Sequence, residues 1–292
     1  MLPAKGILYN DIWKIQRFRK FNSIMRQVML KTKLGTLLAV LTVLLSGLAG
    51  CNSATRVQSQ DPNFRFTRGK EYFEQGKYYK AIDDFNFVVL NNPGDTRADD
   101  AQLFIADAHY EVKEYMVAAS EYRRLIQKYP ESALVEQARY KLGLCLVQLS
   151  PDYQLEQQYT EQAMNTLQGF LEDYPASKYK EEVTKLIGEL RGKMAHKIYS
   201  NAHLYYVLHH YESAVIYCDQ LLNNYYDTPW ANPTRLEKAK SLVKLDRSVE
   251  ARTLLEDLLS RNPKQQIQEN AKQMIEELQP SSSAITQAKG ME

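Results

Sequence analysis

The chain has 292 residues, enough for one elongated domain or two compact ones, and its formal net charge is only +2. Residues 1–50 carry eight basic residues and one acidic residue, and the rest of the chain holds 29 basic and 34 acidic residues, a net charge of −5. A mildly acidic body without a stripe of Lys and Arg argues against nucleic acid as a partner, because that binding requires neutralised phosphates.

An apolar run occupies residues 34–50, follows Lys31 and Lys33, and ends in small residues before Cys51. The run is too short to cross a bilayer comfortably, and this order of basic, apolar and small residues is typical of a cleaved secretory signal. We interpret residues 1–50 as a signal region. An uncleaved signal anchor is the alternative interpretation.

The apolar run lies unusually far from the first residue. Residues 29–50 form a complete signal that begins with Met29, so we interpret residues 1–28 as a product of an upstream start codon. A basic cytoplasmic extension is the alternative. Residues 51–63 are polar and show no apolar period, which predicts a short tether after the signal.

A helix-pair motif follows the tether. Gly69 and Tyr72 stand three residues apart, Ala81 and Phe85 stand four apart, and Pro93 closes the unit. This order of small and aromatic residues with a closing proline is typical of a tetratricopeptide repeat, in which small residues let two antiparallel helices approach closely. One hairpin cannot bury its remaining apolar side, so the motif should recur.

The motif recurs four times. The later copies are marked by Ala106, Ala118, Tyr122 and Pro130; by Gly143, Leu146, Ala163, Leu167 and Pro175; by Ala202, Tyr205, Tyr211, Ala214, Cys218 and Pro229; and by Ala239, Leu242, Ala251, Leu255 and Pro263. The sequence therefore predicts an all-α fold, a tetratricopeptide-repeat superhelical solenoid of about five helix pairs. Repeats 1–3 are expected at residues 64–176 and repeats 4–5 at residues 177–278. A helical bundle with chance spacing is the alternative.

Some stretches depart from the regular repeat. The segment SPDYQLEQQ, residues 150–158, is expected to lengthen the turn inside the third pair. Residues 179–208 lack proline and show helical apolar spacing, which predicts one long amphipathic helix. The connector YYDTPWANP, residues 225–233, is predicted to be non-helical, with Trp230 near the surface or between repeats. Residues 279–292 are predicted to be disordered.

Few residues are candidates for catalysis, metal binding or disulfide formation. Cys145 and Cys218 lie on predicted core faces and are interpreted as buried thiols, with a disulfide between them as the alternative. His196 and His203 share a helix face but have no further ligand at metal-binding spacing. The sequence contains no glycine-rich phosphate loop and no nucleophile elbow. We therefore expect no enzymatic activity, no metal and no cofactor.

The first helices of the first two pairs offer a candidate peptide groove. In tetratricopeptide arrays, the residues one and four places after the small residue face the concave side. Aromatic rings flanked by charges suit an extended peptide, whereas packing of the rings against neighbouring helices is the alternative. The candidates are Phe66, Lys70, Phe73, Leu103, Asp107 and Tyr110.

Several motifs resemble the BamD-type family of outer-membrane protein assembly factors, which are tetratricopeptide-repeat lipoproteins. Leu48-Ala49-Gly50-Cys51 resembles the lipobox of bacterial lipoproteins. GKEYFEQGKYYKAIDDF, the Tyr129-Pro130 and Tyr174-Pro175 ends, and SNAHLYYVLHHYESAVIYCDQLLNNYYDTP resemble repeats of the family. The resemblance extends over residues 51–263.

The resemblance implies a lipid-anchored protein on the periplasmic face of the outer membrane, with acyl chains such as palmitate on Cys51. It implies that the first repeats receive unfolded β-barrel precursors and that repeats 4 and 5 dock a POTRA-containing barrel subunit. The family's basic docking residue has no match beside Asp219, so docking is assigned only to a region, represented by Tyr226, Trp230 and Arg235.

Other functions fit the same sequence pattern. A tetratricopeptide lipoprotein that serves as a scaffold for cell division or peptidoglycan synthesis would have the same composition and repeats. An envelope hydrolase would need a cluster of acids, a nucleophile or a metal site, which the sequence does not show.

Overall fold

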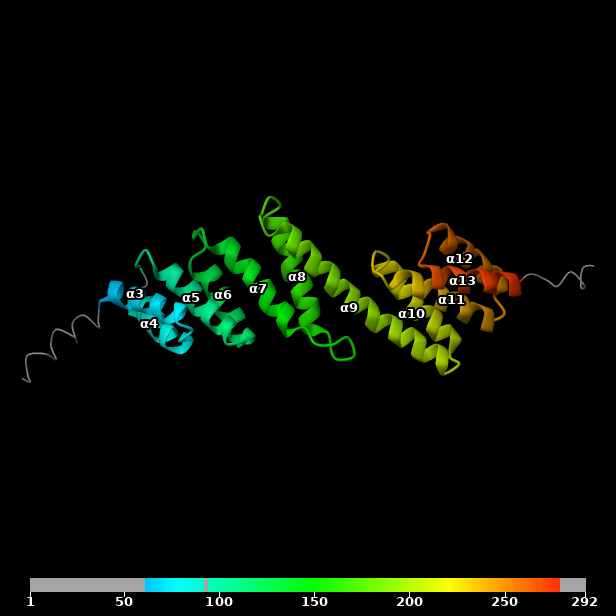
Figure 1. Ribbon diagram of the computed structural model, residues 1–292, viewed down its shortest axis with the longest axis horizontal. Coiled ribbons are helices and arrows are strands. Elements are labelled where there is room, and N and C mark those ends of the chain that lie inside the picture. Colours follow the sequence, from blue (N-terminus) through cyan, green and yellow to red (C-terminus); the bar gives the residue numbers. More distant parts are fainter. Residues whose placement is uncertain (1–60, 92–93, 279–292) are drawn as a thin grey trace, which may run out of the picture. The chain divides into compact units, whose positions relative to one another are not determined.

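The computed structural model describes residues 61–91 and 94–278. Within these ranges the chain forms eleven helices and no strand, which confirms the all-α prediction (Figure 1). The helices are α3 Pro62–Glu74, α4 Tyr78–Asn91, α5 Ala98–Glu111, α6 Tyr115–Lys128, α7 Val135–Leu149, α8 Gln158–Asp173, α9 Lys180–Val207, α10 Tyr211–Asn224, α11 Ala231–Lys244, α12 Ser248–Ser260 and α13 Gln265–Glu277. The signal region, most of the tether, Pro93 and residues 279–292 lie outside the described residues.

The chain divides into two units, residues 1–67 and residues 68–292, and the boundary lies inside α3. In the second unit each helix from α4 to α12 packs on the next helix along the chain, so the helices contact mainly their neighbours in sequence. The additional contacts join α7 with α9, α9 with α11, and α11 with α13. Contacts between near neighbours in sequence are the pattern of stacked helix pairs, so the predicted repeat architecture is confirmed.

The small residues of the motif lie where helices meet. Ala81, Ala106, Ala118, Ala163, Ala202, Ala214, Ala239 and Ala251 are all 0% exposed. At Gly69 an added Cβ would lie 2.9 Å from Cε1 of Phe85, and at Gly143 it would lie closer still to Leu167. The helices of the first and third pairs therefore approach too closely for any side chain at these two positions.

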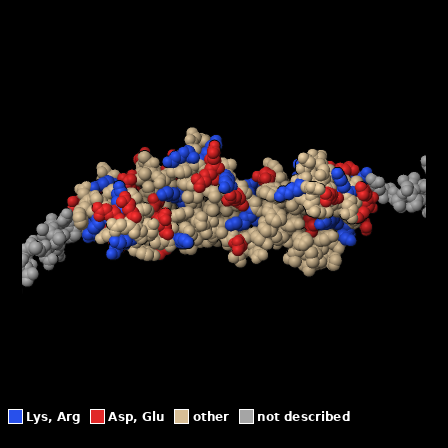
Figure 2. Space-filling model, in the orientation of Figure 1, with Lys and Arg blue, Asp and Glu red and all other residues tan. Residues whose placement is uncertain are grey.

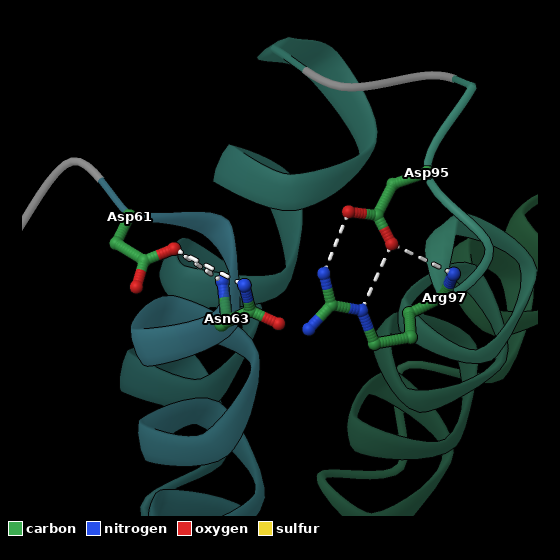
Figure 3. A network of polar contacts seen from close by, with 4 residues as sticks. All are labelled: Asp61, Asn63, Asp95 and Arg97. Atoms are coloured by element: carbon green, nitrogen blue, oxygen red, sulfur yellow. Dashed lines mark hydrogen bonds and ion pairs between the residues drawn. The ribbon is translucent and has the colours of Figure 1, made fainter.

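A short polar turn precedes several first helices. The side-chain oxygens of Asp61, Asp95, Ser132 and Ser177 accept the backbone N–H two residues later, at 2.9 to 3.1 Å. Figure 3 shows two of these turns, Asp61 with Asn63 and Asp95 with Arg97. Such turns satisfy backbone donors that a helix start leaves unpaired.

The fourth pair ends without a proline directly after its capping tyrosine. Tyr225 caps the C-terminus of α10, as Tyr129 caps α6 and Tyr174 caps α8. Tyr226 therefore takes the position that proline holds after the other two tyrosines. Pro229 stands late in this repeat, five residues after α10 ends at Asn224, and the predicted connector indeed begins at residue 225.

The irregular stretches are otherwise close to expectation. Residues 150–157 separate α7 from α8, and α9 is a single helix of 28 residues, so both predictions are confirmed. The connector is shorter than predicted, because α11 begins at Ala231 and includes Pro233. Proline is tolerated in a first helical turn, where its missing N–H would have no helical partner.

The two cysteines of the repeats are free and 0% exposed, which confirms the prediction of buried thiols. Burial raises the pKa of Cys145 and Cys218 to about 12. Both side chains are thus neutral and pack as small apolar groups at neutral pH.

Candidate peptide-binding and docking surfaces

Helix α3 carries three of the predicted groove residues. Phe66 belongs to the first unit and is partly exposed. Lys70 is exposed. Burial and the charge of Asp99 raise the pKa of Asp100 on α5, while the charge of Lys70 acts in the opposite direction. Lys70 therefore contributes positive charge near the start of α5.

Phe73 and Tyr110 occupy equivalent positions, four residues after the small residue of their helices. The ring of Phe73 meets Tyr78 edge-on at 5.3 Å between centroids and Phe104 at 5.4 Å. The ring of Tyr110 meets Tyr115 edge-on at 5.2 Å. Both rings pack against a neighbouring helix. Both also remain partly exposed, so each contributes to the surface of its own helix, α3 or α5.

Leu103 and Asp107 serve mainly the packing of α5. Leu103 is 7% exposed and belongs to the core around α5 to α8. Asp107 accepts a hydrogen bond from the Tyr122 hydroxyl at 2.5 Å, and Lys141 Nζ lies 2.7 and 2.8 Å from its two oxygens. Burial raises the pKa of Tyr122, and the carboxylate of Asp107 raises it further. This network joins α5, α6 and α7, and Lys141 lies 34 residues away from Asp107, in the next repeat.

Tyr226 is the exposed member of the predicted docking region. Its side chain is 67% exposed. The next residue, Asp227, accepts hydrogen bonds from the Arg191 guanidinium at 2.6 and 3.1 Å, and these lower the pKa of the Asp227 carboxyl. Arg191 also donates to the backbone carbonyl of Asn224 at 2.8 Å. Helix α9 thus holds the backbone on both sides of an outward-facing tyrosine.

Trp230 and Arg235 have internal roles. The Trp230 ring stacks on His196 at 4.0 Å between centroids, and Tyr153 stacks on the same imidazole at 3.6 Å. Two rings stacked on one imidazole at these distances occupy opposite faces. Arg235 is 8% exposed, its Nε lies 3.7 Å from Asp257, and burial lowers its pKa. Of the three docking residues, Tyr226 offers the most surface to a partner.

Metal-binding clusters and membrane-spanning helices are not found in residues 61–91 and 94–278. The part of the chain that the structure describes contains no group of three or more His, Cys, Asp or Glu arranged as metal ligands. No helix in that part combines the length and apolar character needed to cross a membrane. Basic and acidic side chains are interspersed over the face in Figure 2. Cys51 lies outside the described residues.

Comparisons with known proteins include a curated relative whose name states the cellular process in which it acts. Residues of this chain are 26% identical over 167 positions to a Caulobacter vibrioides protein named outer membrane protein assembly factor BamD. The match covers 56% of this chain and 54% of the relative, so it spans about half the length of that protein.

Solved helical-repeat structures align over long stretches at low similarity. A tetratricopeptide repeat protein from Parabacteroides merdae is 14% identical, with coverage of 85% of this chain and 83% of that chain and a TM-score of 0.33. The TPR2AB domain of yeast Sti1 is 11% identical, with coverage of 75% and 98% and a TM-score of 0.35. These scores are too low to support a functional argument.

A family model matches more than half of the sequence. Residues 58–244 match the YfiO model, described as outer membrane lipoprotein. This range includes nine of the helices, α3 to α11. Because the match covers more than half of the sequence, the chain belongs to the YfiO family of outer membrane lipoproteins.

Proposed function

We propose that this protein is a non-catalytic scaffold of the β-barrel assembly machinery, anchored through lipid on Cys51 at the periplasmic face of the outer membrane. It binds unfolded outer-membrane protein precursors and a POTRA-containing barrel subunit. The family match over residues 58–244 carries the proposal, since a helix-pair array by itself is compatible with many functions. The name of the Caulobacter relative supports the same process.

The precursor surface is assigned to the first helices of the first two pairs. The exposed parts of Phe73 and Tyr110 contact apolar side chains of an extended segment. Phe66, in the first unit, is proposed as a separate aromatic contact for the precursor. Lys70 pairs with a carboxylate of that segment. Leu103 and Asp107 hold α5 in place through the core and through the contacts with Tyr122 and Lys141.

The barrel-subunit surface is centred on Tyr226. An exposed tyrosine on a backbone held by Arg191 is a suitable anchor, because it buries a large ring at little cost in conformational entropy. Trp230 and Arg235 support this connector through their contacts with α9 and α12.

The mechanism is binding followed by transfer. A stacked array keeps its surfaces in fixed positions, and several acyl chains keep the protein at the membrane where the barrel is inserted. Precursor and subunit associate by side-chain and main-chain contacts, with no covalent step.

Co-purification tests the proposal. The full chain is tagged, isolated from detergent-solubilised membranes and compared with Tyr226→Ala and with Tyr79→Ala, a similarly exposed tyrosine on α4 at 59% exposure. We expect a POTRA-containing barrel protein with the parent chain and with Tyr79→Ala, and a clear loss with Tyr226→Ala. Recovery of peptidoglycan synthases or division proteins in its place would support the scaffold alternative and contradict the proposal.

A further inference from the structure

A surface pocket of about 280 Å³ lies between α6, α7 and α8. Ile126, Leu142 and Phe170 give it an apolar lining, and the side chains of Arg123 and Arg139 border it. The pocket therefore combines two guanidinium groups with apolar surface, although neither arginine belongs to the surfaces discussed above.

A glycine opens this pocket. Gly169 lines it from α8, and a Cβ added there would meet no atom within 4 Å. The same position, six residues after the small residue of the second helix, carries a larger side chain in the other pairs. These residues are Phe87, Arg124, Gln220 and Asp257. The third pair alone among the five leaves this position without a side chain.

The third and fifth pairs differ in the acceptor that faces an arginine of their first helices. Arg139 and Arg235 stand at the same position, four residues before the small residue of their first helices. In the fifth pair Asp257 occupies the position of Gly169, and its carboxylate lies 3.7 Å from Arg235 Nε. In the third pair Arg139 pairs through Nη1 with Asp173, while its Nε is buried and has no hydrogen-bond partner. A buried donor without an acceptor is unfavourable, so the site is suited to an acceptor from outside the chain.

Arg123 supplies a second positive charge at the pocket. Arg123 is exposed, and no ion pair is found for it among the described residues, whereas the adjacent Arg124 pairs with Glu121 at 2.9 Å. The positive charge of Arg123 at the pocket is thus not neutralised by a contact within the described chain.

We propose that this pocket binds a carboxylate carried on a small apolar group. The carboxylate accepts hydrogen bonds from Arg139 Nε and from Arg123, in the position that Asp257 takes in the fifth pair. The apolar group packs on Leu142 and Phe170. The pocket is slightly smaller than the roughly 300 to 1,000 Å³ of pockets for drug-sized ligands, so the apolar group is about the size of one ring. A free organic acid and an acidic side chain of a protein partner both supply this chemistry.

Ligand-observed NMR tests the proposal with benzoate as the probe and neutral benzamide as its control. The full chain is purified in detergent, and saturation transfer to each compound is titrated at neutral pH. We expect benzoate to bind at least tenfold more tightly than benzamide, because only the carboxylate pairs with the arginines. Equal binding of the two compounds, or no binding of benzoate, would overturn the proposal.

Two variants, with one control, test whether benzoate binds in this pocket. Gly169→Leu fills it, and Gly188→Leu is the matched control, because Gly188 is also a helix-interior glycine with no atom within 4 Å of an added Cβ. We expect Gly169→Leu and Arg123→Gln each to weaken benzoate binding at least tenfold and Gly188→Leu to leave it unchanged. Unchanged binding in Gly169→Leu, with its helical circular dichroism retained, would contradict the proposal.

Competition then identifies the source of the carboxylate. The capped tripeptide acetyl-Leu-Glu-Leu-amide carries one side-chain carboxylate and no terminal charge. Displacement of benzoate by this peptide, but not by its Gln counterpart, supports the pocket and assigns it to an acidic side chain of a protein. Benzoate binding without displacement supports the pocket and assigns it to a free organic acid.

Discussion

Two aromatic regions of the molecule use similar residues in different ways. In the first two helix pairs, Phe73 meets Tyr78 and Tyr110 meets Tyr115, rings five residues apart across one turn, and Phe73 also meets Phe104 on α5. Around α9, the stack joins rings from three separate segments, Tyr153, His196 and Trp230. Phe73 and Tyr110 remain partly exposed beside their contacts, whereas the imidazole of His196 lies between two rings from distant segments and holds them together.

The difference separates binding from architecture. Loss of a ring in the first region should weaken binding more than folding. Loss of a ring in the stack should weaken folding first, because the loop before α8, the long helix α9 and the connector before α11 all depend on it.

The largest effect is expected for Trp230→Ala. Removal of the indole takes one of two stacked partners from His196 and a tilted ring contact from Tyr199, and should lower the free energy of unfolding by roughly 2 to 4 kcal/mol. Urea unfolding of the full chain, followed by circular dichroism, measures this. Tyr226→Ala is the control and should change stability by less than about 0.5 kcal/mol, because its side chain is 67% exposed. Equal losses in the two variants would erase the distinction between the regions.

The double variant Phe73→Ala, Tyr110→Ala tests the binding side of the comparison. We expect affinity for a peptide from the C-terminus of an outer-membrane barrel protein to fall about tenfold, or about 1.4 kcal/mol. Fluorescence anisotropy with a labelled peptide measures the affinity, and circular dichroism checks folding. Leu204→Ala, Val207→Ala removes exposed apolar side chains from α9 and should leave affinity unchanged. Unchanged affinity in the Phe73→Ala, Tyr110→Ala variant would contradict the assignment of these rings to the precursor-binding surface.

A smaller effect is expected for Gly69→Ala. The new methyl would lie 2.9 Å from the buried ring of Phe85, and the resulting overpacking of about 1 to 3 kcal/mol exceeds the gain in helix propensity of about 1 kcal/mol. Gly188→Ala on α9 meets no neighbour within 4 Å and should stabilise the chain by about 0.5 to 1 kcal/mol. Urea midpoints that move in the same direction for both would show that α3 and α4 are not closely packed at this glycine.

The smallest effect concerns pH. Burial lowers the pKa of His196, so the unfolded chain takes up a proton at higher pH than the folded chain. Stability from this group is therefore complete above about pH 6.5 and declines as the pH falls below that value. Unfolding measured at pH 7.5 and 5.5 should show this decline in the parent and less of it in His196→Phe.

Much of the fold was predictable, because the small and aromatic residues of the motif lie where the two helices of a pair contact each other. Ala81 and Phe85 are both fully buried, and the spacing of such residues already indicated a helix pair. The start of α11 was misplaced, because Pro233 was taken as a break whereas it lies in the first turn of the helix, where proline is tolerated.

The candidate sites were less predictable, because their contacts come from distant segments. No residue near Asp107 in the sequence predicts its contact with Lys141. No residue near Trp230 predicts that Tyr153 stacks on the same imidazole. The pocket depends on a missing side chain at Gly169, which no motif search records. Only alignment of all five copies at that one position could have drawn attention to it.

Site-specific crosslinking tests the central claim most directly. A photoreactive residue is placed at Lys70, or at Val249 on α12, which is 82% exposed, and the full chain is irradiated in membranes during synthesis of an outer-membrane barrel protein. The account predicts a crosslink between position 70 and the unfolded precursor and none at position 249. Absence of a precursor adduct at position 70, or equal adducts at both positions, would contradict it.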